Sequence, residues 1–301
     1  MVKMLIRLID APWSMIKRLS SRELLEAIKL SEGRTIAAEI VVTSEPLIDG
    51  VSNIEIASAF GADIIILNFY DVIRKEIKGL PKEINSLSKL RDFTGRVIGI
   101  NLEPVREEKA KELGYTQGRL ATPDNAETAV QDGVDILVIT ANPKTGVTFR
   151  DITKATEEIR DHVGEKVLIL AGKMHLAGRY GEVLTGDIID SIHKSGADGL
   201  LIPAPGTIPG FTLETAERIV SYAHRRELIV MSCIGTSQEG ADSDTIRRIA
   251  FLGKMSGADI HHIGDSGFKP GVAIPENILA YSIAIRGRRH TYRRISQSIL
   301  R

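Results

Sequence analysis

Hydrophobic positions follow one pattern four times along the chain. The segments are "GADIIILN" (61–68), "GVDILVIT" (133–140), "GADGLLIP" (196–203) and "GADIHHIG" (257–264). Each ends a stretch of helical period with glycine and then enters a short β-prone run, which is typical of a helix C-cap followed by a buried strand. Successive repeats are 61 to 72 residues apart, about twice the ~30 residues of a minimal βαβ unit. A second strand is therefore expected within each interval.

Further apolar runs fill these intervals. "RVIGINLEP", "KVLILAGKMH" and "ELIVMSCIG" lie between successive repeats, and "RTIAAEIVVTSEP" precedes the first. The runs alternate with amphipathic segments of helical period such as "TLETAERIVSYAHRR" and "DSDTIRRIAFLGKMSG". The expected strands lie near residues 35–42, 63–68, 97–102, 135–140, 166–171, 199–203, 228–233 and 259–263.

Eight apolar strands that alternate with helices favour a parallel sheet covered by helices, closed into an α/β (β/α)8 TIM barrel. A doubly wound open sheet is the alternative, but no G-x-G-x-x-G fingerprint follows any strand. No linker divides the chain, so we expect one domain over residues 1–301. We expect residues 1–33 to form a helix that closes the bottom of the barrel. The side chains that it should bury are Trp13, Met15, Ile16, Leu19 and Leu24.

The repeated "GAD" followed by four apolar residues resembles the helix-to-strand corners of (β/α)8-barrel enzymes, over nearly the whole chain. The sequence also resembles a bacterial barrel family, some members of which carry a haloacid-dehalogenase label. That label implies an aspartate nucleophile in a D-x-D motif after an early strand. No such motif follows an early strand here, so we do not expect dehalogenase chemistry.

Composition narrows the classes of partner. Lys plus Arg and Asp plus Glu both number 39, so no basic excess draws the chain to nucleic acid. Charged residues such as Lys3, Arg7, Asp10 and Lys17 interrupt the N-terminal apolar run before the ~20 residues that span a membrane. The single cysteine, Cys233, excludes an intramolecular disulfide and a multi-cysteine zinc site. We expect a cytoplasmic protein without a membrane anchor.

Barrel enzymes carry their sites at the C-terminal ends of the strands. In this chain the loops after the strands are polar and rich in Gly and Pro, whereas the opposite loops are short. The asymmetry indicates a small-molecule site on that face, with a partner-binding surface as the alternative. The basic segment 286–301 is expected to be a solvated helix end, with an acidic partner, RNA or a neighbouring subunit as alternative contacts; because the net charge is zero, we expect no nucleic-acid partner. We expect a homo-oligomer.

The two adjacent histidines of the last repeat should point in opposite directions, because side chains alternate along a strand. Aligning the repeats places Asn68 and Thr140 in one column and His262 in the column two residues earlier. Polar side chains suit the mouth of a barrel better than a helix-facing surface. We therefore expect His262 to point inward as an acid/base, hydrogen-bond donor or metal ligand, and His261 to be a core residue facing the helices.

Lys173 follows the fifth strand, and the same register puts Ile169, Ala171 and Lys173 on one face. A lysine at the apolar mouth of the barrel should have a lowered pKa, which would make its amine a nucleophile or base. This arrangement resembles the Schiff-base lysine of class I aldolases, although that lysine usually comes from the sixth strand. The alternative is that Lys173 pairs with a substrate phosphate or with a carboxylate such as Glu39 or Glu103.

The loops "IGTSQEG" and "GDSGFKPG" after the last two strands are rich in Gly and Ser/Thr, which favours a phosphate or carboxylate anion there. Asp265 and Glu239 would repel an anion unless they face away or bind a cation. A divalent metal is an open possibility because several strand ends carry His, Asp or Glu side chains, although no H-x-H or H-E-x-x-H pattern supports it. Its candidate ligands are Glu39, Glu45, Glu103, His175, His262 and Asp265.

The sequence favours an aldolase-like lyase or an isomerase that acts on a small phosphorylated or carboxylated metabolite. A metal-dependent hydrolase or epimerase and a non-catalytic binding or regulatory barrel are the alternatives. The expected catalytic residues are Lys173, His262, His175, Glu39 and Glu103. The expected substrate-binding residues are Asn68, Asn101, Thr140, Gly235, Thr236, Ser237, Asp265, Ser266 and Gly267.

Overall fold

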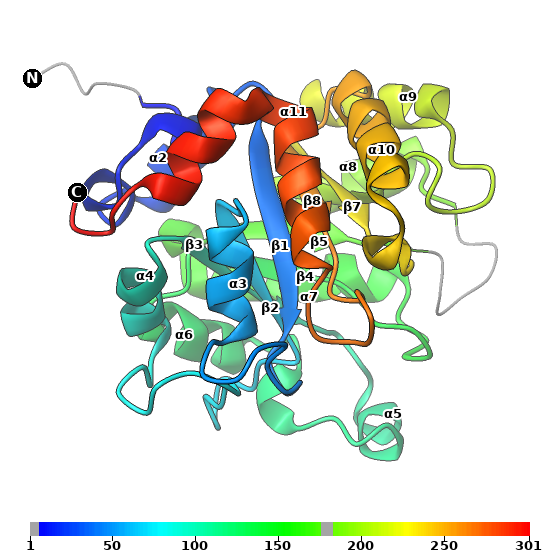
Figure 1. The fold of residues 1–301 in the computed structure, drawn as a ribbon. Helices are drawn as coiled ribbons and strands as arrows, with labels where there is room; N and C mark the ends of the chain where they lie inside the picture. The colour runs from blue at the N-terminus through cyan, green and yellow to red at the C-terminus, as the bar shows by residue number, and fades with distance from the viewer. Residues whose placement is uncertain (1–5, 176–182) are drawn as a thin grey trace, which may run out of the picture.

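The computed structural model describes residues 6–175 and 183–301, and its strands form a closed parallel barrel in the order β1 to β8 (Figure 1). Each strand pairs with the next, and β8 pairs with β1. The (β/α)8 fold expected from the sequence is confirmed. The strands are β1 (Thr35–Val41), β2 (Ile64–Asn68), β3 (Val97–Leu102), β4 (Ile136–Ile139), β5 (Leu168–Gly172), β6 (Gly199–Pro203), β7 (Ile229–Ile234) and β8 (Ile260–Ile263).

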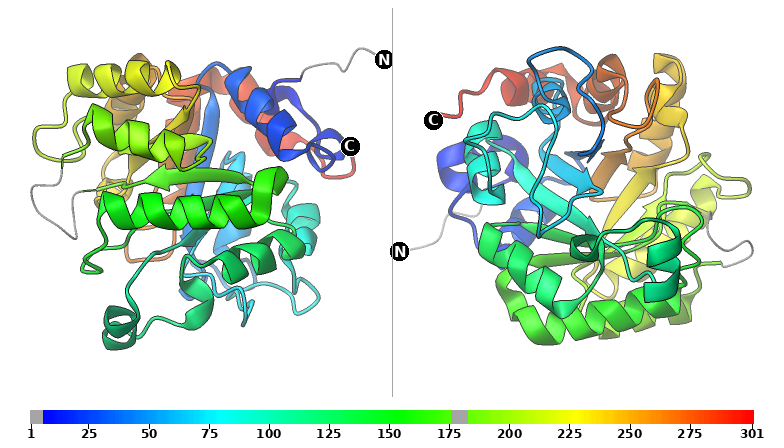
Figure 2. Two further views of the ribbon diagram at one scale, coloured as in Figure 1. Left: turned by 180° about the vertical axis from the view of Figure 1, so that it is seen from behind. Right: turned by 90° about the horizontal axis from the view of Figure 1, so that it is seen from below.

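Helices surround the ring of strands (Figure 2). Capping boxes begin α3 at Ser52 and α7 at Thr148, and a left-handed glycine, Gly133, ends α6. The glycine that ends α6 is the helix end expected from the repeat at 133–140. The helices between strands are α3 (Asn53–Ala59), α4 (Leu87–Thr94), α5 (Glu107–Glu112), α6 (Pro123–Asp132), α7 (Phe149–Val163), α8 (Gly186–Lys194), α9 (Leu213–His224) and α10 (Ser243–Met255). Helix α11 (Pro275–Ser296) follows β8.

The described part of the N-terminal segment packs against the first residues of the strands, and it contains two short α-helices where we expected one. These are α1 (Trp13–Ile16) and α2 (Ser21–Lys29). Their apolar side chains form one cluster with the first residues of the strands, such as Ile64 and Val97. The expected burial of Met15 is wrong, because this residue is 40% exposed. It stands on the outer side of the short helix α1, away from the cluster that Trp13 and Ile16 join.

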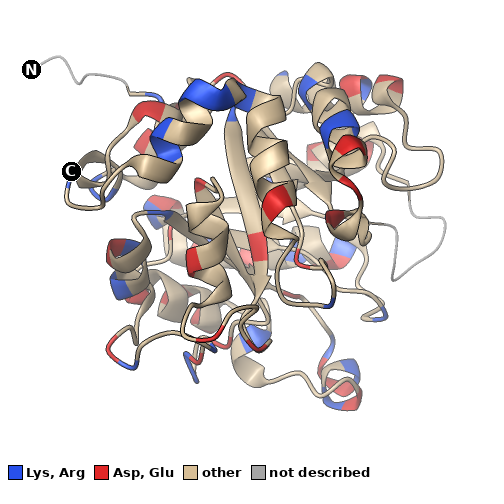
Figure 3. Cartoon of the chain, in the orientation of Figure 1, with Lys and Arg blue, Asp and Glu red and all other residues tan. Residues whose placement is uncertain are grey.

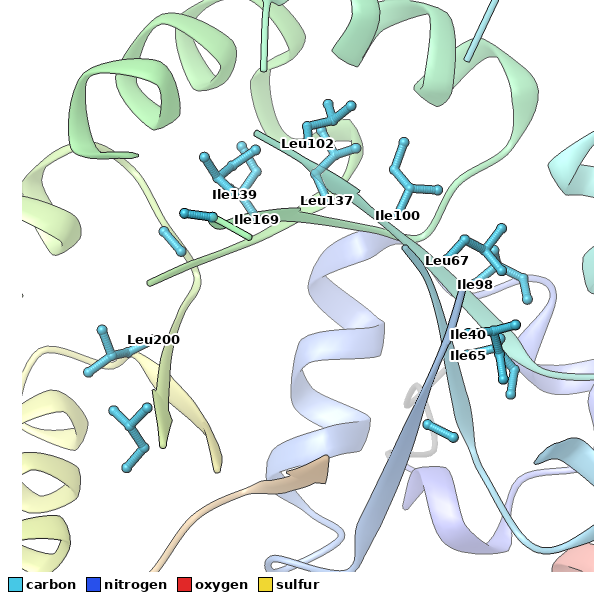
Figure 4. Close-up of a cluster of buried hydrophobic side chains, with 14 of the residues drawn as sticks. Ile40, Ile65, Leu67, Ile98, Ile100, Leu102, Leu137, Ile139, Ile169 and Leu200 are labelled. Carbon is cyan, nitrogen blue, oxygen red and sulfur yellow. The ribbon is translucent and has the colours of Figure 1, made fainter. Parts of the chain in front are cut away.

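Alternation along the strands separates two apolar layers. Ile66, Val138 and Leu201 belong to the inner layer, which is the face that the repeats predict. The neighbouring positions point outward to the helices (Figure 4). The side chain of Ile169 lies in this outer layer beside Leu137 and Ile139. The strand residues of both layers are buried, so the ring is a packed core and the room for a ligand lies at its ends.

The basic C-terminal segment is only partly a solvated helix end. Gly287, with φ 74°, breaks α11 and turns its second half toward the N-terminal segment (Figure 1). Arg286 and Arg294 are buried and hold Asp63, with Nη1 of Arg286 2.5 Å from Oδ2 and Nε of Arg294 2.6 Å from Oδ1. The expectation that this segment is solvated is wrong for these two arginines, because their charges meet a buried carboxylate.

Charges of both signs are spread over the surface, and basic residues recur along the second half of α11 (Figure 3). Arg293, which is exposed, donates through Nη1 to Oδ1 of Asp10 at 3.0 Å. Burial lowers the pKa of Arg96, which lies beside Asp63 and Arg294, to about 9.

Among the described helices, none is both long and apolar enough to span a membrane.

Candidate functional site

A polar pocket of about 310 Å³ opens where the strands end at their carboxyl side. We call it the central pocket and define it by its polar lining residues. These are Glu39, Asn68, Asn101, Thr140, Asn142, His175, Gly235, Ser237, Glu239, Asp265 and Ser266. The ends of several strands and the loops after them share this opening, so residues that are far apart in the sequence meet there. Most of the substrate-binding residues expected from the sequence are brought together, and Asn142 and Glu239 join them.

Glu39 forms the floor of the central pocket. The amide Nδ2 of Asn101 donates to Oε1 of Glu39 at 2.6 Å, and Nε2 of His262 lies 3.0 Å from Oε2. His262 points into the barrel interior as the register predicts, but it is fully buried beneath Glu39. Cys233 pairs with His262 in the sheet, and burial together with the charge of Glu39 raises the pKa of its thiol well above the usual range. Glu39 and Asn101 therefore line the pocket, whereas His262 lies behind Glu39 in the barrel interior.

Two further carboxyl groups, Asp265 and Glu239, face the same pocket. Asn68 Nδ2 donates to Oδ2 of Asp265 at 2.9 Å. Burial raises the pKa of Asp265 to about 6, and the charge of Glu39 adds to this effect while the bond from Asn68 opposes it. Burial likewise raises the pKa of Glu239 to about 8, with the charges of Asp265 and Glu39 acting in the same direction. Burial therefore favours the protonated form of both carboxyl groups, and more strongly for Glu239 than for Asp265.

Glycine at position 264 makes room for Glu239. A Cβ atom there would lie 2.2 Å from Oε1 of Glu239 and 2.7 Å from the carbonyl oxygen of Ile234. Since the second neighbour is backbone, a larger residue would displace both the carboxyl group and the end of β7. Gly264, directly after β8, thus leaves space for a carboxyl group close to the strand.

Several buried polar atoms of the central pocket have no hydrogen-bond partner among the described residues. They are Oδ1 of Asn101, Oγ1 of Thr140 and Oε2 of Glu239. Buried polar atoms in proteins are nearly always paired, so such atoms require an explanation. All three belong to residues that line the pocket, and each is positioned to exchange a hydrogen bond with a bound ligand or water.

Glu103 does not line the central pocket, although we expected it to be catalytic. Its carboxylate accepts from Tyr115 Oη at 2.8 Å, from the backbone N–H of Asn142 at 2.8 Å and from Asn142 Nδ2 at 2.9 Å. Arg119 completes the set at 3.3 Å. With these donors around it, Glu103 fixes Asn142, whose Nδ2 also reaches Oδ1 of Asn68. Glu103 therefore supports the wall of the site.

Lys173 also lies outside the central pocket. The inner positions of β5 are Leu168 and Leu170, so Ile169 and Ala171 lie on the outer face, toward the helices. We expected the face of Ile169 and Ala171 to line the mouth of the barrel, and this expectation is wrong. After β5 the chain turns at Gly172, with φ 145°. Nζ of Lys173 then lies 4.9 Å from the centre of the Phe149 ring, in a neighbouring pocket, whereas His175 lines both pockets.

Two expected anion-binding residues are engaged elsewhere. Thr236 donates through Oγ1 to the carbonyl oxygen of Thr207 at 3.0 Å. Gly267 packs against backbone, because a Cβ atom there would lie 2.6 Å from the carbonyl oxygen of Val272. Neither residue lines the central pocket. The side chains that do reach it from these loops are Ser237 and Ser266, together with the carboxyl groups described above.

His261 is a core histidine, as its outward position predicts. Nε2 donates to the carbonyl oxygen of Gly33 at 3.1 Å, and the ring packs edge-on against Tyr281 of α11. Burial lowers its pKa to about 4. Among residues 6–175 and 183–301, no group of three or more His, Cys, Asp or Glu side chains is arranged to hold a metal ion. Glu45, a metal candidate, instead forms an ion pair with Lys78.

Eight parallel strands with polar side chains gathered at their carboxyl ends define a (β/α)8 TIM-barrel protein. The chain belongs to the family described as Domain of unknown function (DUF7916), which matches residues 9–301. A search of curated proteins gives no match. The family description carries no haloacid-dehalogenase label.

Solved structures resemble the chain at the level of the fold. The YdjI aldolase from Escherichia coli K12 is 10% identical, with a TM-score of 0.50, and the match covers 92% of this chain and 96% of that one. A 2,3-dimethylmalate lyase is 12% identical, with a TM-score of 0.49 and coverage of 83% and 82%. A thiamine phosphate pyrophosphorylase from Pyrococcus furiosus is 14% identical, with a TM-score of 0.48 and coverage of 85% and 97%. At these identities the likeness shows the barrel fold alone.

Proposed function

We propose that this protein is an enzyme that moves protons on a small polar substrate, as an aldolase-like lyase or an isomerase. The observation that carries the proposal is the pair Asp265 and Glu239. Both face the central pocket, and their pKa values are raised to about 6 and about 8. Two titratable groups whose pKa values are separated around neutrality can serve as base and acid in one reaction. Asp265 would accept the proton and Glu239 would donate one.

The rest of the central pocket suits a substrate with a carbonyl and neighbouring hydroxyl groups. Asn68, Asn101 and Asn142 supply amides at its wall, and the unpaired oxygens of Asn101 and Thr140 supply further hydrogen-bonding positions. Removal of a proton next to a carbonyl begins an isomerisation, and removal of a proton from a β-hydroxyl group begins an aldol cleavage. Both reactions need a base and an acid that are held on opposite parts of the substrate.

The carboxyl groups of the central pocket limit where an anionic group of the substrate can lie. Its described lining includes Glu39, Glu239 and Asp265 but no Lys or Arg. A phosphate or carboxylate group at the loops after β7 and β8 would approach these carboxyl groups and be repelled. We therefore place any anionic group of the substrate outside the central pocket.

Hydrogen exchange on a panel of compounds tests this proposal while the substrate is still unidentified. The protein is incubated in deuterium oxide with keto acids, hydroxy acids, aldehydes and ketoses, and NMR or mass spectrometry detects deuterium bound to carbon. We expect exchange with at least one compound class, reduced about 100-fold or more by Asp265→Asn. Glu158→Gln, on the exposed face of α7, is the matched control. Full exchange in both Asp265→Asn and Glu239→Gln would refute the proposed roles.

A further inference from the structure

A second cavity of about 190 Å³ lies beside the central pocket. We call it the side pocket and define it by Phe149, Leu201, Ile208, Phe211 and Ile219, together with Lys173. Its wall is built from the start of α7, from β6, from the loop after β6 and from α9. Most of the wall is apolar, and a cavity of this kind takes up hydrocarbon from water readily.

The two pockets share one short stretch of chain. Lys173 lines the side pocket, Met174 lines the central pocket, and His175 lines both. The turn at Gly172 produces this arrangement, because it directs consecutive side chains to the two cavities. Residues 173–175 are therefore the common wall, and a ligand in one pocket lies next to the other.

The two pockets differ in the charged groups of their described lining. The central pocket carries three carboxyl groups, whereas the described lining of the side pocket includes Lys173, only 5% of whose surface is exposed, and no carboxyl group. Its Nζ lies over the ring of Phe149. Asp151 is close enough for the charge of Lys173 to help lower its pKa, although burial opposes this and the hydrogen bonds from Thr148 contribute more. The carboxyl groups of the central pocket disfavour an anionic group there, whereas the ammonium group of Lys173 can donate a hydrogen bond to a carboxylate in the side pocket.

We propose that the side pocket binds the apolar body and the carboxylate of an amphipathic carboxylic acid. The carboxylate contacts Lys173, the hydrocarbon part packs on Phe149, Phe211 and Ile219, and the reacting carbon reaches the central pocket past His175. The assignment of this molecule as the substrate rests on the proposed function. Recognition of the carboxylate by Lys173 requires only the side pocket.

A matched set of six-carbon probes tests the inference by titration calorimetry at pH 7. The probes are hexanoate, hexan-1-ol and hexylamine, with acetate as the probe that lacks the hydrocarbon. We expect hexanoate to bind most tightly and hexylamine and acetate to bind at least about tenfold more weakly. Lys173→Met should lower the affinity for hexanoate about tenfold or more and leave that for hexan-1-ol unchanged. Ile219→Trp, which fills the cavity, should abolish both.

Lys154→Met is the control for general charge, because Lys154 is an exposed lysine on α7 that pairs with Glu158. Circular dichroism and thermal unfolding establish that each variant is folded. Equal hexanoate affinity in the native protein and Lys173→Met would overturn the inference, as would hexylamine binding as tightly as hexanoate. Absence of binding by both hexanoate and hexan-1-ol at millimolar concentration would also overturn it.

The same variants separate this inference from the proposed function. Hexanoate binding that persists in Asp265→Asn, while deuterium exchange is lost, supports both. Normal exchange in Asp265→Asn and Glu239→Gln together with hexanoate binding that depends on Lys173 would refute the acid–base roles and leave the side pocket standing. Exchange that depends on Asp265 without any hexanoate binding would refute the side pocket alone.

Discussion

Asn101 of β3 donates a hydrogen bond of 2.6 Å to Glu39 of β1, across the mouth of the barrel and past the intervening strand β2. Both residues are buried, with 4% of each surface exposed. The bond keeps the carboxylate of Glu39 directed at the ligand side of the pocket while His262 supports it from below. A buried carboxylate has lost its hydrogen bonds to water, so its stability in the folded protein depends strongly on donors such as Asn101.

Asn101→Leu removes this donor and leaves Glu39 buried with one partner fewer. We expect the free energy of unfolding to fall by about 1–3 kcal/mol. The double variant Glu39→Met/Asn101→Leu should lose less than the sum of the two single variants, because it removes the charge together with its donor. Urea denaturation of all four proteins measures the coupling. Strictly additive losses would show that the bond contributes nothing.

Glu239→Gln should change how stability depends on pH. The pKa of Glu239 is raised to about 8 in the folded protein, so the folded state binds the proton more tightly than the unfolded state. The native protein therefore loses stability as the pH rises from about 4.5 to about 8, by up to about 4 kcal/mol. The variant should lack this loss, and Glu217→Gln, at an exposed site of α9, should retain it. Urea unfolding at pH 5 and pH 8 compares them.

Asp63→Asn should be severely destabilising. The substitution leaves Arg286 and Arg294 buried without their counter-charge, which costs about 3–5 kcal/mol. Asp244→Asn breaks an exposed ion pair with Arg247 and should cost less than about 1 kcal/mol. Thermal and urea unfolding distinguish the two. Similar small losses in both variants would mean that the buried arginines find other partners.

His261 should remain neutral well below the pH at which an ordinary histidine is protonated. Its pKa is lowered to about 4 by burial, and the unfolded chain therefore binds more protons below about pH 6.5. Stability should fall as the pH drops from about 6.5 toward 4, by up to about 3 kcal/mol. NMR titration of the imidazole signals tests this, with His261→Gln to assign the resonance. A midpoint above pH 6 would contradict it.

Borohydride trapping should give no adduct on the peptide that contains Lys173. Its Nζ lies over the Phe149 ring in the side pocket, apart from the carboxyl groups that would move protons in an imine mechanism. Pyruvate, glycolaldehyde and glyceraldehyde serve as carbonyl compounds, and mass spectrometry locates any modified lysine. An adduct on Lys173 would restore the Schiff-base mechanism that the sequence suggests.

The strand pattern predicts the barrel because helix ends, apolar runs and side-chain alternation are local properties of the sequence. The same alternation places His261 and His262 correctly, since β8 remains extended through both residues. The error at Lys173 has a different cause. Side chains alternate along β5, but we expected Ile169 and Ala171 on the inner face, which Leu168 and Leu170 occupy.

The details of the site depend on contacts between distant segments, which no local pattern contains. Asn101 lies at the end of β3 and Glu103 lies directly after it, so the two residues are close in sequence. Only Asn101 lines the pocket, because Tyr115, Arg119 and Asn142 bind the carboxylate of Glu103. Glu239 enters the pocket because Gly264, on the neighbouring strand end, leaves space for it. Neither outcome follows from residue type and spacing within one loop.

The arginines around Asp63 also bear on the order in which the barrel assembles. Arg294 contacts Asp63, which is 231 positions away in the sequence, and donates to the carbonyl oxygen of Leu8, which is 286 positions away. Loops of this length are costly to close before other contacts have formed, so such pairings come late in folding. The contacts between the most distant segments of the chain therefore form last, and synthesis must extend past Arg294 before Asp63 has both of its counter-charges.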